Sequence, residues 1–165
     1  MTTVMQTVRE VLDALKWSYS VDEERKLIAT RVNGNNGDWR CMAFCGAADQ
    51  FFILNICPGR VPPARRAACA ELLTRINYDH DNCCFEMDFK DGEVRVRSSS
   101  PVVEGAIQRA AVEHVLFSNC AAIDRFLPAI MAVIFGDRSP TSALEDKQQK
   151  KKKSKAPGAP RFQMN

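Results

Sequence analysis

The side chains with the greatest potential for chemistry in this sequence are two carboxylates, one histidine and several cysteines. Glu86 and Asp88 alternate along one predicted strand and could serve as an acid and base pair. The Asp91-Gly92 pair that follows predicts a two-residue type I′ turn, which places Arg97 opposite Glu86. The same turn places Arg95 opposite Asp88. Because each carboxylate then has a cationic partner, we interpret these side chains as surface ion pairs and predict no catalytic residue among them.

The histidine and the cysteines could bind a metal, but their spacing does not favour it. His80 lies between Asp79 and Asp81, whose carboxylates favour a charged imidazole, and we interpret it as a solvated loop residue. Cys41 and Cys45 fall on one face of a predicted strand. Zinc sites usually contain closely spaced ligand pairs such as Cys-x-x-Cys, and the seven cysteines form none. We therefore predict reduced core thiols, no metal, no cofactor and a cytoplasmic location, and leave a redox or metal role of these two cysteines open.

Motifs that carry catalysis are missing from the sequence. It contains no glycine-rich phosphate loop, no His-Glu-x-x-His and no Gly-x-Ser-x-Gly. We therefore predict that the protein is not an enzyme.

The composition indicates one domain with a basic extension. The 165 residues are 45% apolar and 26% charged, which suits a single domain at residues 1–146. That part holds 16 Lys/Arg against 20 Asp/Glu, whereas residues 147–165 hold seven Lys/Arg and no acid. The extension has too little apolar surface to fold, so we predict a disordered lysine-rich tail. It is either a solubilising segment or a weak, salt-dependent polyanion site formed by Lys150, Lys151, Lys152, Lys153 and Lys155.

Neither membrane insertion nor export is expected. The longest strongly apolar run, residues 126–135, is half the length of the ~20 residues that span a bilayer. Arg9, Glu10 and Asp13 interrupt the N-terminal segment where a secretory signal needs an apolar core.

The apolar periodicity predicts an α+β fold. Four stretches read as helices and five as strands, and a kink at Pro128 or a break near residues 118–124 is expected in the long helical region. The order α-β-β-β-α-β-β-α(α) predicts an antiparallel five-stranded sheet with helices mainly on one side. The expected helices are residues 3–16, the segment after Pro63, about 102–135, and 140 to about 147, and the expected strands are 26–32, 39–45, 51–57 and the two arms of 83–99.

Several apolar side chains of the predicted sheet are candidates for contact with a polypeptide partner. An antiparallel sheet can leave one face or one edge open for such a partner. For each candidate the alternative is packing against the helices, and the hairpin pattern itself places Phe85, Met87, Phe89, Val94 and Val96 in the core. The partner-binding candidates are Phe44, Phe51, Ile53 and Phe89.

Three segments in this order resemble the YbjN domain family. They are LLTRINY at 72–78, FEMDFKDGEVRVRSS at 85–99 and DRFLPAIMAVIFGDRSPTSAL at 124–144, and Trp39 after an Asn/Gly turn matches as well. The resemblance covers about residues 5–145, with Cys83-Cys84 standing where a glycine-containing turn is expected. It implies a fold like the type III secretion chaperones, a regulatory role without known catalysis, a polypeptide partner and a homodimer formed through the late helices.

A nucleic-acid-binding protein is the alternative. The order helix, three strands, helix also occurs in double-stranded RNA modules, in which Arg65-Arg66 would contact phosphates. The negative charge of residues 1–146 argues against this function. We therefore predict a non-catalytic, protein-binding regulatory or chaperone-like domain, with nucleic-acid binding through the second helix and the tail as the alternative.

Overall fold

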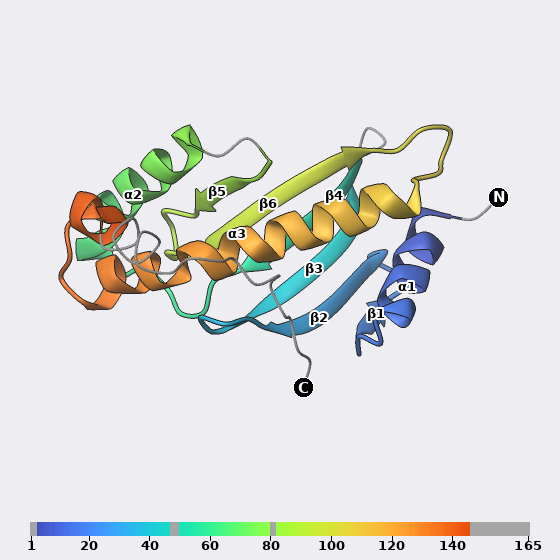
Figure 1. The fold of residues 1–165 in the computed structure, drawn as a ribbon, viewed down its shortest axis with the longest axis horizontal. Coiled ribbons are helices and arrows are strands. Elements are labelled where there is room, and N and C mark those ends of the chain that lie inside the picture. The colour runs from blue at the N-terminus through green and yellow to red at the C-terminus, as the bar shows by residue number, and fades with distance from the viewer. Residues whose placement is uncertain (1–2, 47–49, 80–81, 146–165) are drawn as a thin grey trace, which may run out of the picture.

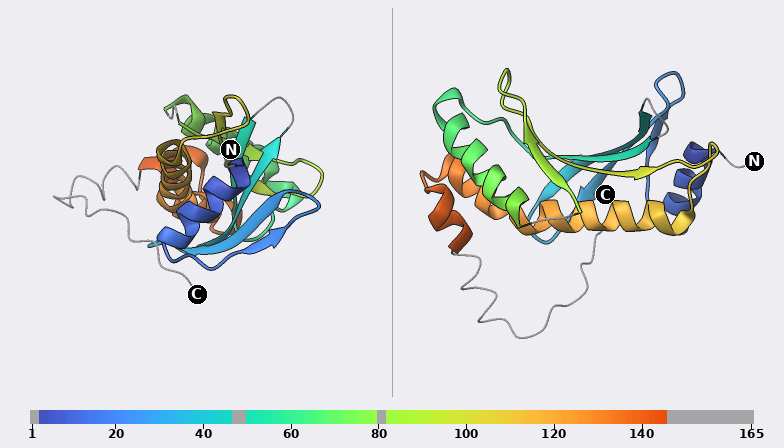
Figure 2. Two further views of the ribbon diagram at one scale, coloured as in Figure 1. Left: turned by 90° about the vertical axis from the view of Figure 1, so that its right-hand side faces the viewer. Right: turned by 90° about the horizontal axis from the view of Figure 1, so that it is seen from above.

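The computed structural model describes residues 3–46, 50–79 and 82–145 and shows an α+β fold (Figure 1). The antiparallel sheet and its accompanying helices confirm the predicted fold class. A 3₁₀ turn, Pro63–Arg65, leads into the second helix. The helices are α1 (Val4–Ala14), α2 (Arg66–Tyr78) and α3 (Arg109–Phe135), and all three lie on one face of the sheet (Figure 2).

The predicted number of strands is wrong, because the described residues form six strands in the order β1-β2-β3-β4-β6-β5. The additional strand, β1 (Ser20–Asp22), pairs with β2. It is only three residues long and contains an aspartate, so it shows no alternating pattern that the sequence could reveal. The other strands are β2 (Leu27–Asn33), β3 (Asp38–Gly46), β4 (Gln50–Ile56), β5 (Cys84–Met87) and β6 (Val94–Pro101).

The first two helices bury the faces that the sequence predicts, and α1 is slightly shorter than the predicted helix at residues 3–16. The Thr3 hydroxyl caps α1 by accepting a hydrogen bond from the Gln6 amide at 3.3 Å. Prolines in the 3₁₀ turn before α2 are tolerated because the first amides of a helix have no partner within it. The buried residues of α2 are Cys69, Leu72, Leu73 and Ile76, as predicted.

Helix α3 is continuous over 27 residues, so the break expected near residues 118–124 does not occur. Figure 2 shows that the helix bends toward its C-terminal end instead. Pro128 has no N–H to donate to the Asp124 carbonyl, and the side-chain amide of Asn36 donates to that carbonyl at 2.9 Å. The Asp124 carboxylate accepts further hydrogen bonds from the Asn36 amide and from Asn35. The loop between β2 and β3 therefore supports the bend.

The end of α3 is capped as the sequence predicts, by Gly136. Residues 140–145 are helical, and the expected end of this last helix near Lys147 lies outside the described residues. By length and composition α3 could cross a membrane, but 61% of its most apolar window is buried within the protein. That burial is typical of a core helix.

The turn between β5 and β6 differs from the predicted type I′ turn. Glu86 pairs with Arg95, and Phe85 pairs with Val96, so the register is shifted by two residues. The loop is longer because the carboxylates of Asp88 and Asp91 each accept the amide two residues ahead. A shift of two residues keeps every side chain on its expected face, and Phe85, Val94 and Val96 are buried as predicted, with Met87 packed against the core. The loop itself carries Phe89, which is 59% exposed and not in the core.

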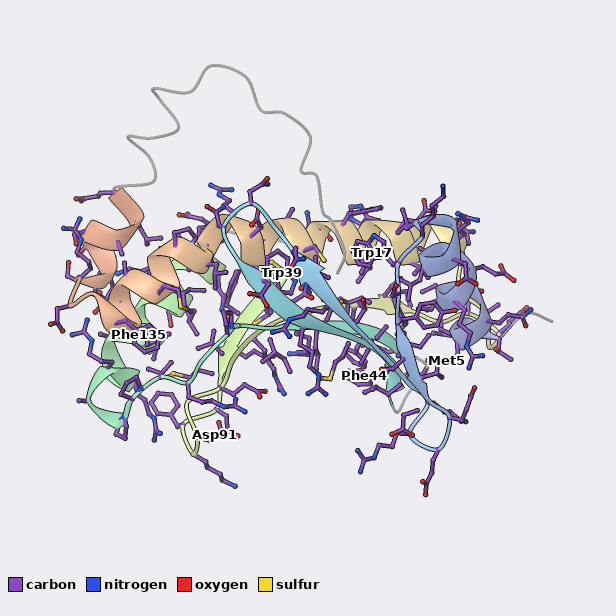
Figure 3. The ribbon with its side chains drawn as sticks, turned by 90° about the horizontal axis from the view of Figure 1, so that it is seen from below. Met5, Trp17, Trp39, Phe44, Asp91 and Phe135 are labelled. Carbon is purple, nitrogen blue, oxygen red and sulfur yellow. The ribbon has the colours of Figure 1, made fainter. Side chains whose placement is uncertain are left out.

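The core lies between the sheet and the helices. Figure 3 shows Trp39 between the sheet and α3, whereas Phe44 lies on the other side of the sheet. Both residues belong to β3, and the buried positions Trp39, Cys41 and Ala43 alternate with Arg40, Met42 and Phe44 along it. The same alternation in the neighbouring strands defines an inner face, toward the helices, and an outer face.

Candidate functional site

The carboxylates first considered for catalysis are held in ion pairs. Glu86 accepts hydrogen bonds from Arg95 at 2.9 Å and from Arg97 at 2.6 Å. Partial burial acts to raise the pKa of Glu86, but the hydrogen bonds from Arg97 and Arg95 outweigh it, and the pKa is lowered. Asp88 does not pair with Arg95, contrary to the prediction, because the register is shifted and its carboxylate accepts the Lys90 amide. These groups position β5 against β6.

The other candidates for chemistry are equally constrained. His80 lies outside the described residues. Contact with the Cys120 thiol and burial raise the pKa of Cys41 well above its usual value. Burial raises the pKa of Cys57 to about 12 and that of Cys83 to about 11, so these thiols remain protonated at neutral pH. Within the described part of the chain, no three His, Cys, Asp or Glu side chains are grouped so that they could hold a metal ion.

A buried polar cluster joins α3 to the middle of the sheet. The Asn119 side chain is fully buried and donates to the Ser98 hydroxyl at 2.8 Å and to the main-chain carbonyls of Ile53 and Val96 at 3.3 Å. It accepts a hydrogen bond from Asn55 at 2.8 Å. The sequence analysis did not identify this cluster, although a polar residue within the apolar part of a helix is its signal. Because it is closed to solvent, we assign it to positioning of α3.

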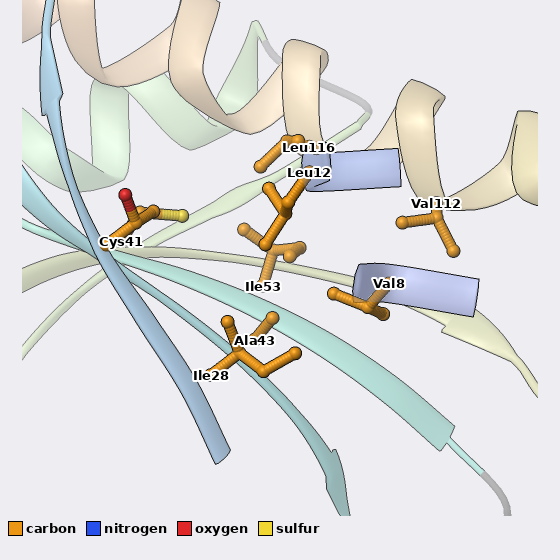
Figure 4. A pocket seen from close by; sticks show the side chains of 9 residues that line it. Val8, Leu12, Ile28, Cys41, Ala43, Ile53, Val112 and Leu116 are labelled. Atoms are coloured by element: carbon orange, nitrogen blue, oxygen red, sulfur yellow. The ribbon is translucent and has the colours of Figure 1, made fainter. Parts of the chain in front are cut away.

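A small cavity between α1, α3 and the sheet is also structural (Figure 4). Its volume is about 10 Å³, which is about the space of one water molecule. Its walls are almost entirely apolar and include Val8, Leu12, Ile53 and Leu116. A ligand larger than water does not fit there.

The outer face of the sheet offers a much larger accessible surface. Seven apolar side chains lie there, outside the cluster that packs between the sheet and the helices; six of them are partly exposed, and Leu54 is buried at 6% exposure. They are adjacent across the strands, because Phe44 pairs with Leu27 on one side and Phe52 on the other, and Met42 pairs with Ala29 and Leu54. Phe44 and Phe52 stack with their ring centroids 5.4 Å apart. The seven are Leu27, Ala29, Met42, Phe44, Phe52, Leu54 and Ile56.

Four arginines border this apolar group: Arg31, Arg40, Arg95 and Arg97. Arg31 pairs with Asp38 at 2.9 Å, and Arg95 and Arg97 share Glu86. Among the described residues, no carboxylate lies within ion-pair distance of Arg40, whose guanidinium is 3.1 Å from the Met42 sulfur. The outer face therefore combines an apolar centre with an available cation, and the β1–β2 turn and the β5–β6 loop project on the same side (Figure 2).

The four predicted partner-binding residues lie in three different environments. Phe44 is on the outer face. Phe51 and Ile53 are 0% and 1% exposed on the inner face, in the packing against the helices that was the alternative for each. Phe89 is exposed at the tip of the β5–β6 loop, away from the other three. The sequence analysis missed Phe52, which stacks on Phe44, because β4 is apolar on both faces.

The edge of the sheet at β5 is closed by a side chain. The Asn77 amide donates to the Phe85 carbonyl at 2.9 Å, and its oxygen accepts the Phe85 N–H at 2.8 Å. One side chain thus occupies two of the main-chain groups that an added strand would use. This contact gives a physical role to the Ile-Asn-Tyr motif at the end of α2.

The two arginines of the nucleic-acid alternative have internal partners. Arg65 donates to the carbonyls of Val133 and Arg138 at 2.8 and 3.0 Å, and so holds the C-terminal end of α3. Arg66 donates to the Phe89 carbonyl at 2.7 Å. The lysines of the predicted tail lie outside the described residues.

The sequence matches a known protein family, and the fold is similar to that of a solved structure. Residues 5–132 match the YbjN family, described as "Putative bacterial sensory transduction regulator". The fold is similar to the crystal structure of YbjN from E. coli, described as a putative transcription regulator, with a TM-score of 0.58 and 14% identity over 82% of this chain and 92% of that chain. At this identity the likeness shows a shared fold.

A second solved structure, the HopA1-SchA chaperone-effector complex, is more distant. It has a TM-score of 0.46 and 11% identity over 72% of this chain and 88% of that chain. A similarity this low carries no functional conclusion. No curated protein matches the sequence.

Proposed function

This chain belongs to the YbjN family, as its motifs predicted, and on that basis we propose that it is a non-catalytic regulatory domain that binds a polypeptide partner. The observation that carries the proposal is the apolar group on the outer face. A contiguous apolar surface of this kind is a common sign of a binding site. A partner that covers Phe44, Phe52 and their neighbours would remove this surface from water, which favours association.

A chaperone-like role and a fold like the type III secretion chaperones are the finer parts of this proposal. An open apolar face suits a polypeptide that is extended or partly unfolded. The proposed location is the cytoplasm, which is compatible with seven cysteines that form no disulfide. A homodimer through α3, where Phe117 and Phe135 are 37% and 65% exposed, stays a prediction that light scattering can check.

The nucleic-acid alternative has less support. Its two arginines, Arg65 and Arg66, already donate to main-chain carbonyls. Polyanion binding by the lysine tail also remains a prediction, and both can be separated from protein binding in one experiment.

The experiment captures partners from lysate with three forms of the full chain: wild type, an outer-face variant and a control. The outer-face variant carries Phe44→Ser and Phe52→Ser, and the control carries Tyr78→Ser and Val103→Ser, at exposed positions that belong neither to the outer face nor to α3. Thermal melting confirms that each form is folded. We expect protein partners that survive nuclease, are retained by the control and are lost by the outer-face variant. Partners that disappear with nuclease would favour the nucleic-acid alternative, and partners retained by the outer-face variant would contradict the proposed surface.

A further inference from the structure

We propose that the outer face recognises an acidic amphipathic segment, with apolar side chains over the centre of the sheet and a carboxylate at Arg40. This inference rests on the proposed function and adds to it the chemistry of the partner and the way in which it docks. Three features carry it: the arrangement of the apolar and cationic rows, the repulsion at Arg40, and the closed edge of the sheet.

The outer face is organised in three rows that cross the strands. Leu27, Phe44, Phe52 and Ser99 form the first row, and Ala29, Met42, Leu54 and Arg97 form the second, so both rows are apolar from β2 to β4. Arg31, Arg40, Ile56 and Arg95 form the third. Rows are two residues apart along each strand, which is about 7 Å. An amphipathic segment that covers the two apolar rows therefore places its polar flank over the arginines.

The charges of the third row favour a carboxylate on that flank. Arg31 and Arg40 are directly opposite each other on β2 and β3, an arrangement that is unfavourable for like charges. Asp38 pairs with Arg31, whereas in the described part of the chain no carboxylate pairs with Arg40, which donates to the Met42 sulfur. Both arginines line a surface hollow together with residues 18–20 and with Ala29 and Thr30 of β2, so there is room for a side chain beside Arg40. A partner carboxylate would pair with Arg40 and relieve the repulsion.

The same features favour docking on the face over addition of a strand. Asn77 occupies the main-chain groups of Phe85 at the β5 edge. The opposite edge strand, β1, is only three residues long, and short edge strands resist pairing. The partner therefore binds through its side chains.

The stacked pair of Phe44 and Phe52 also indicates which class of molecule binds to the outer face. Stacked aromatic side chains on an open sheet can bind nucleic-acid bases, but Phe44 and Phe52 stack on each other and are surrounded by aliphatic side chains. Three of the four arginines are already paired with carboxylates. This combination fits an amphipathic polypeptide, which brings apolar side chains together with a carboxylate for Arg40, better than a strand of phosphates.

Selection from a library of random short peptides on the full chain tests the inference. The variants are Arg40→Glu, which places an acid opposite Arg31 and so should preserve the fold, and the control Arg125→Glu on α3. We expect selected peptides to combine apolar residues with Asp or Glu and to bind Arg125→Glu as tightly as wild type. They should bind Arg40→Glu about tenfold more weakly, and selection on Arg40→Glu should favour basic peptides.

Other results would overturn the inference in distinguishable ways. Apolar peptides without acids, which bind Arg40→Glu normally but not Phe44→Ser, would refute the acidic partner and leave the proposed function standing. Acidic peptides insensitive to Arg40→Glu would indicate binding to the lysine tail. If no enriched peptide depends on either residue, both the inference and the proposed function fail. If the chain self-associates and Phe44→Ser abolishes this, the occupant of the outer face is a second copy of the chain. If a single-stranded RNA probe binds and Arg40→Glu abolishes the binding, the occupant is RNA.

Discussion

Phe51 and Phe52 are adjacent in the sequence but lie on opposite faces of β4, so truncating each should give a different result. Phe51 is fully buried under the helices, and Phe51→Ala should lower the free energy of unfolding by about 3 to 5 kcal/mol. Phe52 is half-buried, stacks on Phe44 and packs over Gly46, where a Cβ would lie 2.5 Å from the ring. Phe52→Ala should cost only about 1 to 2 kcal/mol.

The two changes should separate stability from binding. The free energy of unfolding of a domain of this kind is about 5 to 15 kcal/mol. Phe51→Ala should remove a large part of it, whereas Phe52→Ala should not. Urea unfolding followed by circular dichroism measures both costs, and partner capture at low temperature measures binding. We expect Phe52→Ala to remain folded and lose the partner, while the folded fraction of Phe51→Ala retains it. Equal costs, or full binding by Phe52→Ala, would refute the assignment of the two faces.

Three further predictions concern contacts that hold the fold. Asn36→Ala should lower the free energy of unfolding by about 1 kcal/mol. The same change should cost much less in a Pro128→Ala background, because residue 128 then has a main-chain N–H of its own to donate. A coupling energy below about 0.5 kcal/mol in a double-mutant cycle measured by urea unfolding would contradict this. Asn77→Ala should cost about 1 to 2 kcal/mol by freeing the N–H and carbonyl of Phe85 and should increase self-association, which light scattering measures; an unchanged mass would count against edge protection. The lowered pKa of Glu86 contributes stability at neutral pH that is lost as the pH falls through that lowered value. Glu86→Gln should therefore lose less stability in acid than wild type. Identical profiles of unfolding free energy against pH would rule this out.

Much of the fold was predictable because its helices carry long apolar stripes. The stripe of α2 and the alternation in β3 each specify both the element and its buried face. The kink expected at Pro128 was also predictable, because proline removes a main-chain donor wherever it lies. That Asn36 supplies the replacement was not, since the two residues are far apart in the sequence.

The face assignment of β4 could not be predicted from its own sequence. Residues 51–56 are almost continuously apolar, so the alternation that separates inner from outer positions is absent. Pairing with β3 resolves it, because Phe44 faces Phe52 and Cys45 faces Phe51. This is why Phe51 and Ile53 were chosen as candidates and Phe52 was not. The hairpin register was missed for a different reason, namely that aspartate side chains stabilise a longer loop.

Site-specific photocrosslinking tests the proposed surface most directly. A photoreactive phenylalanine analogue at position 52 would probe the outer face, and the same analogue at position 117 would probe the exposed side of α3. The proposed function predicts a crosslink to the partner polypeptide at position 52 and none to it at position 117, where a homodimer through α3 would give only crosslinks between two copies of this chain. Crosslinks to the partner at position 117 alone, or crosslinks at position 52 only to nucleic acid, would contradict it.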